Sequence, residues 1–334
     1  MQPLKGRGLI TEKEKSTAKN EDSDHKFFRI LIVAYISSWV GFCLLVHHNK
    51  EAKDLSSVPS IIITVEIVKL AFASVLFCKS SGGAGELMHF FRDHEQFLKE
   101  MKRYFPIAAL YAICNNLMMF NLKNNNPIVY QILKGSRLLM VAVVWQIFFQ
   151  TQIPKKRKVA LVLITIGLMI KCFEQNGDAG VKDVHMEKSW WEALFGFSLV
   201  LLEMACGVMA SVYNEKMLKQ VKCDQYLQNI CLYLNSIVTN AAIFLVPTDT
   251  NGGGQEASLL SKTSVMIVIA LAAGGLMTAM MIRAAGSVTK CVVAASITIV
   301  TCVIDVAFFN YKLVTPEAVA VTLVTLGSAI YSLH

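Results

Sequence analysis

Charged residues are scarce in this sequence. Asp, Glu, Lys and Arg make up only 17% of the 334 residues, whereas hydrophobic residues make up 54% and the mean hydropathy is +0.49. About a quarter of the residues in a typical soluble domain are charged, so this composition excludes an ordinary soluble protein. Apolar runs of about 20 residues recur instead, and that length crosses the hydrocarbon core of a bilayer as a helix. The sequence therefore predicts an all-α membrane protein. A membrane β-barrel is excluded because the runs do not alternate polar and apolar residues.

Patterns that would indicate catalysis or metal binding are also missing. The nine cysteines include no CxxC pair and mostly lie within apolar runs, so neither a disulfide framework nor a metal site is indicated. No acidic residue stands at helical spacing from a histidine inside such a run. The basic stretch at 155–158 is what a short cytosolic loop carries, and the glycines at 252–254 are flanked by acids as in a flexible linker. We therefore expect no enzyme, no cofactor and no nucleic-acid partner.

The apolar runs predict ten membrane-spanning helices. Their expected ranges are 27–47, 57–78, 104–122, 127–149, 158–174, 190–212, 226–247, 263–283, 288–310 and 316–332. Residues 1–26 are polar, carry lysines and show no hydrophobic periodicity. No apolar segment follows their charges at the spacing of a signal peptide, so we expect a disordered tail.

The distribution of basic residues predicts the orientation. Loops on the side of the N-terminal tail carry 20 Lys and Arg residues, and loops on the other side carry 8. Basic residues favour the cytosolic side of a membrane. Both termini are therefore expected in the cytosol, and ten spans is an even number, as termini on the same side require.

An internal repeat supports two halves. Shifting the sequence by 160 residues places 127–170 over 287–330 without a gap, and ten of the 44 positions are identical. The matches include the pairs Phe148 with Phe308 and Gly167 with Gly327. Two halves of five spans each, 27–174 and 190–332, would then enter the membrane from opposite sides. Such inverted repeats are typical of secondary transporters, which bind substrate near the bilayer midplane between the halves.

Two basic residues inside the fourth predicted span point to the substrate. Tyr130, Lys134 and Arg137 fall on one face of a helix, and each cation costs about 2.5–3.5 kcal/mol at mid-bilayer. Lys290 aligns with Tyr130 under the repeat and could reach the same cavity from the other half. Converging cations favour a multiply charged anion such as a phosphate or diphosphate.

A structural explanation of these charges is also open. Lys134 lies near a helix end and could pair with an acid, and three acids fall within predicted spans: Glu66, Glu203 and Asp305. Glu66 and Lys69 are three residues apart, so we expect them to form a structural ion pair. Tyr213 could face the cavity or anchor its helix at the membrane interface.

Four segments resemble the nucleotide-sugar transporters. The first is YAICNNLMMFNLKNNNPIVYQILKGSRL, which looks like a family segment with YALQNN followed by YQVTYQLK. TVEIVKL resembles TEVIKL, and GVMASVYNEKMLK with LQNICLYL resembles SGFAGVYFEKxLK with RNIQMYL. GGLMTAMMIRAAGSVTKCVVAASITIV resembles GGLxxAVVVKYADNIxKGFATSLSIVL. The matches run in order from about residue 60 to 332 and resemble the branch that carries CMP-sialic acid, UDP-galactose or UDP-N-acetylglucosamine.

The resemblance implies a ten-helix fold of the drug/metabolite transporter superfamily and an antiporter of the Golgi or endoplasmic reticulum membrane. A cytosolic, pyrimidine-based nucleotide sugar would exchange for lumenal nucleoside monophosphate. Carried over by motif, the family's substrate-binding positions fall on these residues: Tyr130, Lys134, Arg137, Lys290, Asn115, Asn116 and Tyr213.

This sequence departs from the family motifs near those positions. Arg137 replaces a lysine, Lys134 replaces a tyrosine, and GSVTKCV replaces DNIxKGF. The positive charge is kept or increased, but the base and sugar are not fixed by it. Two alternatives stay open: a carrier of another phosphorylated anion or free nucleotide, and a membrane adaptor that transports nothing. The choice between Golgi and endoplasmic reticulum and the formation of a homodimer are open as well.

Overall fold

The computed structural model describes residues 26–42, 45, 59–80, 83–124, 130, 133–175, 190–221, 223–244, 262–309 and 315–333. Helices account for nearly all of these residues, and the described ranges contain no strand. The expected disordered tail lies outside the described residues except for Lys26, and so does the linker at 252–254. The side chain of Asp305 also lies outside what the structure describes.

The helices follow the apolar runs of the sequence. A first helix covers 26–42, and the labelled helices are α3 Pro59–Ser80, α4 Ala84–Arg92, α5 His94–Asn124, α7 Arg137–Phe149, α8 Lys155–Gln175, α9 Trp190–Gln220, α10 Gln225–Phe244, α11 Lys262–Phe309 and α12 Thr315–Leu333. Exposed apolar side chains such as Phe72, Ile147 and Phe195 point outward, as expected where lipid replaces water.

Four of the described helices are long and apolar enough to cross a membrane: Ile61–Ser80, Leu194–Gln220, Lys262–Phe308 and Thr315–Leu333. Helices at other predicted spans, such as α5 and α10, do not meet that measure. The α11 helix has 48 residues, and its backbone leaves helical geometry at Gly286, where φ is 86° and ψ is 167°. It therefore consists of two helical segments, where the sequence predicted two spans.

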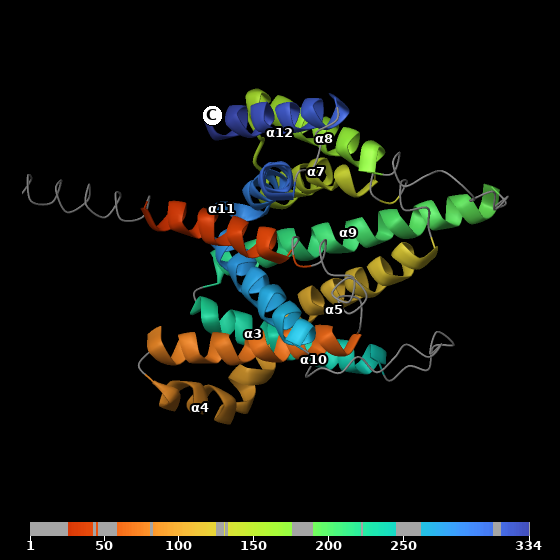
Figure 1. Cartoon of the computed structure of the whole chain (residues 1–334). Helices are drawn as coiled ribbons and strands as arrows, with labels where there is room; N and C mark the ends of the chain where they lie inside the picture. Colours follow the sequence, from red (N-terminus) through yellow and green to blue (C-terminus); the bar gives the residue numbers. More distant parts are fainter. Residues whose placement is uncertain are drawn as a thin grey trace, which may run out of the picture.

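The helices form two groups around the long helix α9. In Figure 1, α8 and α12 lie together at one edge, with α7 and the second segment of α11 beside them. At the opposite edge α10 packs between α3 and α5, and α4 lies against α5 and α3. The α9 helix crosses the middle and contacts α5, α7 and α11. Side chains of α9 can thus reach both groups.

Helices α8 and α12 meet at two glycines that the repeat relates to each other. A Cβ atom at Gly167 would lie 2.8 Å from Val324 and 2.9 Å from the carbonyl oxygen of Ala320. A Cβ atom at Gly327 would lie 2.6 Å from Ile164 and 2.9 Å from the carbonyl oxygen of Ala160. Each contact is the image of the other under the 160-residue shift. Only glycine permits so close an approach of the two backbones.

Candidate functional site

The partly or fully buried charges of the bundle fall into two classes. Four cations have a carboxylate partner: Lys69 with Glu66, Arg103 with Glu100, Lys134 with Glu203 and Lys219 with Glu215. Four others that are partly buried have neither a carboxylate partner nor a hydrogen bond among the described residues: Arg137, Lys290, Arg157 and Lys216. Because an unpaired cation in a membrane is costly, the second class marks places where an anion is missing.

Glu203 ties the start of the fourth predicted span to α5. Its side chain is fully buried in α9 and accepts hydrogen bonds from Asn121 Nδ2 at 2.8 Å, Tyr130 Oη at 3.1 Å and Lys134 Nζ at 2.6 Å. The Lys134 ammonium also lies 5.2 Å from the centre of the Tyr130 ring. Of the two roles that the sequence left open for Lys134, the structure displays pairing with an acid.

Arg137 is the first residue of α7 and contacts α9 one helical turn beyond Glu203. Ser136 forms a turn whose amide N–H bonds to the Leu133 carbonyl at 3.0 Å, so the predicted span 127–149 is not one uninterrupted helix. The guanidinium lies against α9, where a Cβ atom at Gly207 would be 2.9 Å from Arg137 Nη2. Glycine at 207 thus leaves the room that the guanidinium occupies. The positive end of the α7 dipole adds to the charge of Arg137.

Lys290 approaches from the other half. It lies in the first turn after the break at Gly286, and its positive charge and that of Arg137 are close enough to repel each other. Val141, on the helical face that the sequence assigned to Arg137, is fully buried in an apolar cluster with Ile164 and Val292. The cationic region is therefore confined to the first turns of two helical segments. Helix N-termini favour anions at such positions.

The sequence interpretation missed polar side chains near Arg137. Tyr111 of α5 lies near the Arg137 charge and next to Ser211 and Asn214 of α9. The hydroxyl of Ser211 is buried without a hydrogen-bond partner. The spacing of Gly207, Ser211 and Asn214 places them on one face of α9, which was the available signal.

The remaining predicted site residues have other partners. Asn116 donates to the carbonyl of Ala112 in its own helix at 2.8 Å, and Asn115 is partly buried. Tyr213 packs against the apolar cluster formed by α3, α4, α5 and α10. Glu66 and Lys69 form an ion pair on α3, and the Lys69 ammonium lies 5.0 Å from the Tyr233 ring centre.

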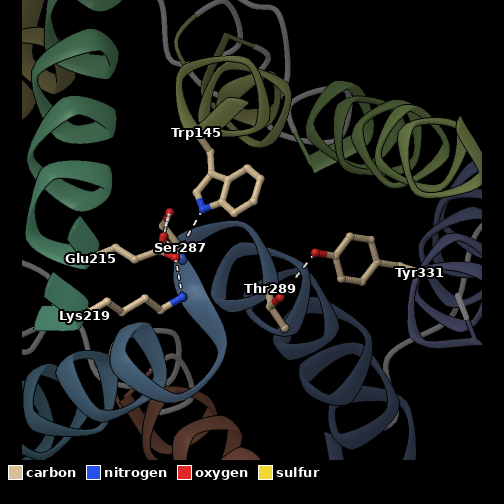
Figure 2. A network of polar contacts seen from close by, with 6 residues as sticks. All are labelled: Trp145, Glu215, Lys219, Ser287, Thr289 and Tyr331. Carbon is tan, nitrogen blue, oxygen red and sulfur yellow. Dashed lines mark hydrogen bonds and ion pairs between the residues drawn. The ribbon is translucent and has the colours of Figure 1, made fainter. Parts of the chain in front are cut away.

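A second buried carboxylate, Glu215, organises the other end of α9. Figure 2 shows it receiving hydrogen bonds from Trp145 Nε1 at 3.1 Å and Lys219 Nζ at 2.7 Å through Oε1. Its Oε2 accepts from the main-chain N–H of Ser287 at 2.7 Å and from the Ser287 hydroxyl at 2.6 Å. Glu215 therefore caps the second segment of α11. The side chain of Glu215 is fully buried.

The sequence of this chain is similar to those of known transporters. Relatives include the UDP-galactose transporter senju of Drosophila melanogaster, 24% identical over 76% of this chain and 73% of its own length. The CMP-sialic acid transporter 1 of Oryza sativa subsp. indica is 22% identical over 76% of this chain and 77% of its own length. A transporter of UDP-N-acetylglucosamine and UDP-N-acetylgalactosamine from Caenorhabditis elegans, nstp-4, is 24% identical over 78% and 80%. These relatives are transporters and not enzymes.

One solved crystal structure shares the fold. Its TM-score is 0.61 at 10% sequence identity, and the alignment covers 91% of this chain and 96% of the other. Residues 21–332 match the family described as nucleotide-sugar transporter. Since this match covers most of the sequence, the chain belongs to the nucleotide-sugar transporter family.

Proposed function

We propose that this protein is an antiporter that exchanges a cytosolic nucleotide sugar for a lumenal nucleoside monophosphate. The observation that carries the proposal is the unpaired state of Arg137 and Lys290 among the described residues. Two cations that repel each other in a membrane protein are stabilised by a ligand of at least two negative charges. The diphosphate of a nucleotide sugar has that charge, and the product monophosphate has it as well.

The proposed role of each residue follows from its neighbours. Arg137 offers a planar, bidentate donor to phosphate oxygens, and Lys290 offers a point charge from the other half. Tyr111, Ser211 and Asn214 add uncharged polar groups beside Arg137. Asn115, Asn116 and Tyr213 would meet the base or sugar. Lys134 and Tyr130 would join the site only by exchanging Glu203 for the substrate.

The mirrored glycine contact supports the proposed transport architecture. The contacts of Gly167 on Val324 and of Gly327 on Ile164 exchange under the 160-residue shift, as a pseudo-two-fold axis requires. We propose ten spans in two inverted halves, with both termini in the cytosol. Cysteines introduced at 48–56 and 216–222 should be labelled from opposite sides of the membrane. Labelling of both from one side would exclude this topology.

The names of the relatives favour a pyrimidine nucleotide, and the Golgi or endoplasmic reticulum membrane is proposed from the resemblance in the sequence. The relatives named above carry UDP or CMP sugars by description. Counterflow into proteoliposomes preloaded separately with UMP, CMP, GMP or AMP identifies the base. We expect fast uptake of labelled nucleotide sugar only with the matching internal nucleotide. Equal uptake without preloading would exclude obligatory exchange, and no uptake with any nucleotide would favour the adaptor.

The phosphate assignment is tested by Arg137→Ala and Lys290→Ala. Each charge-assisted bond contributes about 1.5–3 kcal/mol, so each change should weaken nucleoside-monophosphate binding about ten- to a hundredfold. Arg283→Ala is the matched control, because Arg283 is an exposed cation of the same helix as Lys290. Binding is measured by thermal shift of the purified protein, with the stability of the unliganded protein recorded alongside. Normal affinity in the variants, with or without a loss of stability, would make the two cations structural.

A further inference from the structure

A cavity lies beside the Glu215 network, at the end of the bundle where α8 begins. Its volume is about 190 Å³, and it is bounded by the ends of α7, α9 and α12, the start of α8 and the break in α11. The side chains that matter for its chemistry are Trp145, Arg157, Glu215, Lys219, Thr289 and Tyr331. Neither Arg137 nor Lys290 lines it. The cavity is thus separate from the proposed central site.

Arg157 is the charge in this cavity that lacks a partner. Its guanidinium carbon lies 5.2 Å from the centre of the Tyr331 ring, so the ring holds the side chain in place. The Nε atom is buried without a hydrogen-bond partner, and no described carboxylate forms an ion pair with Arg157. A buried guanidinium N–H without an acceptor is costly. An acceptor entering the cavity would remove that cost.

The rest of the lining also favours an anion. Lys219 uses one donor on Glu215 at 2.7 Å, and its side chain is 38% exposed, which leaves its other N–H groups available. The hydroxyl groups of Thr289 and Tyr331 lie 3.2 Å apart, side by side in Figure 2. Glu215 contributes a negative charge, but Lys219, Trp145 and Ser287 already occupy both of its oxygens.

Two helix N-termini add partial positive charge to this cavity. Helix α8 begins at Lys155, beside the cavity, and the second segment of α11 begins directly after Gly286. The first N–H groups of a helix have no partner within it and carry partial positive charge. Their convergence on a cavity that already holds Arg157 and Lys219 gives a net positive site.

From this geometry we propose that the cavity is a second anion site, which binds a phosphate ester on the side predicted to face the cytosol. Arg157 would bind the phosphate in a bidentate manner, Lys219 would add a charge-assisted bond, and the hydroxyls of Thr289 and Tyr331 would orient it. The ester is either a soluble phosphorylated compound or the headgroup of an anionic lipid. The proposal does not depend on what Arg137 and Lys290 bind.

The test is binding of radiolabelled inorganic pyrophosphate to the purified full chain. We expect two pyrophosphate sites in the unaltered protein and one after Arg157→Gln. Lys156→Gln is the matched control, because it removes the same charge from an exposed position of the same helical turn, and it should leave both sites. Isotherms that are indistinguishable for Arg157→Gln and Lys156→Gln would overturn the proposal.

A variant that lacks the two central cations tests this site independently of the proposed function. In the Arg137→Ala/Lys290→Ala protein, the remaining binding should weaken at least about tenfold on adding Arg157→Gln. If this background fails to fold, the stoichiometry in the otherwise unaltered protein decides. Absence of any Arg157-dependent binding while the Arg137- and Lys290-dependent site is present would contradict only this inference, and the reverse would contradict only the antiporter.

Nanodiscs distinguish the two sources of the phosphate group. Pyrophosphate binding is compared in neutral phosphatidylcholine and in the same lipid doped with a phosphatidylinositol phosphate. Arg157-dependent competition by the doped lipid identifies a headgroup site. Binding that the doped lipid leaves unchanged identifies a soluble ligand.

Discussion

Helix α9 carries two fully buried carboxylates that do different work. Glu203 and Glu215 are about 18 Å apart along the axis at about 1.5 Å per residue, on either side of Gly207, where Arg137 lies. Glu203 receives side-chain donors only, from Asn121, Tyr130 and Lys134. Glu215 receives the main-chain N–H at the start of a helical segment as well as side chains.

The two carboxylates differ in what they stabilise. Glu203 neutralises a cation that would otherwise be buried alone, so it joins α9 to the fourth predicted span. Glu215 completes the backbone hydrogen bonding of a broken helix next to Lys290. Removing the first leaves an uncompensated charge, whereas removing the second leaves an uncapped helix end. The following changes separate these two costs.

The largest effect is expected for Glu203→Ala. The change leaves the partly buried Lys134 without its carboxylate and removes the oxygens that accept from Asn121 and Tyr130, which together cost about 3–5 kcal/mol of unfolding free energy. Thermal unfolding of the purified protein measures it. Removing both charges in Lys134→Met/Glu203→Leu should restore most of that stability, because the uncompensated cation is gone. A double variant as unstable as the single one would show that the charge is not the cause.

A smaller loss is expected for Glu215→Ala, about 1.5–3 kcal/mol from charge-assisted bonds. Ser287→Ala removes only the hydroxyl bond and keeps the main-chain bond to Glu215, so it should cost about 1 kcal/mol. Both are measured by thermal unfolding. If Lys219→Ala reproduced the whole effect of Glu215→Ala, the ion pair and not the helix cap would be what Glu215 contributes.

Gly286→Ala should cost about 1–3 kcal/mol. The backbone at Gly286 has a φ of 86°, and a Cβ atom would lie 2.6 Å from Glu215 Oε1. Gly85→Ala is the control, since Gly85 is helical and has open space around its Cβ position, and it should gain up to about 1 kcal/mol. Equal effects of the two substitutions on thermal unfolding would argue against strain at the helix break.

The smallest effect is expected for Tyr331→Phe. It removes one hydrogen bond to Thr289 and keeps the ring beneath Arg157, so about 0.5–1.5 kcal/mol is lost. A loss as large as that of Glu215→Ala would mean that the hydroxyl supports the Glu215 network and not only its own pair.

The sequence predicted the helices well because apolar length is a local property. It placed the break between 283 and 288, and the structure has it at Gly286. Spacing within one helix also brings Glu66 and Lys69 together, and they form an ion pair. Both conclusions need only the period of an α-helix.

Contacts between distant segments were beyond this reasoning. Glu215 and Ser287 are separated by 72 residues, and their meeting depends on how α9 and α11 are placed against each other. The face shared by Lys134 and Arg137 was inferred from an unbroken helix. Both side chains meet α9, where Lys134 binds Glu203 and Arg137 lies against Gly207 one turn further along, and these partners could not be read from spacing alone.

The glycine contact between α8 and α12 determines whether lipid acyl chains can enter between these two helices. In a bilayer, lipid tails are as apolar as the side chains they displace, so many helix pairs separate at little cost. At Gly167 and Gly327 the backbones leave no space even for a methyl group, and a lipid tail cannot wedge them apart. Helix α12 is therefore part of the packed bundle. Removing the chain from Thr315 onward would expose to lipid a face of α8 that fits closely against the α12 backbone.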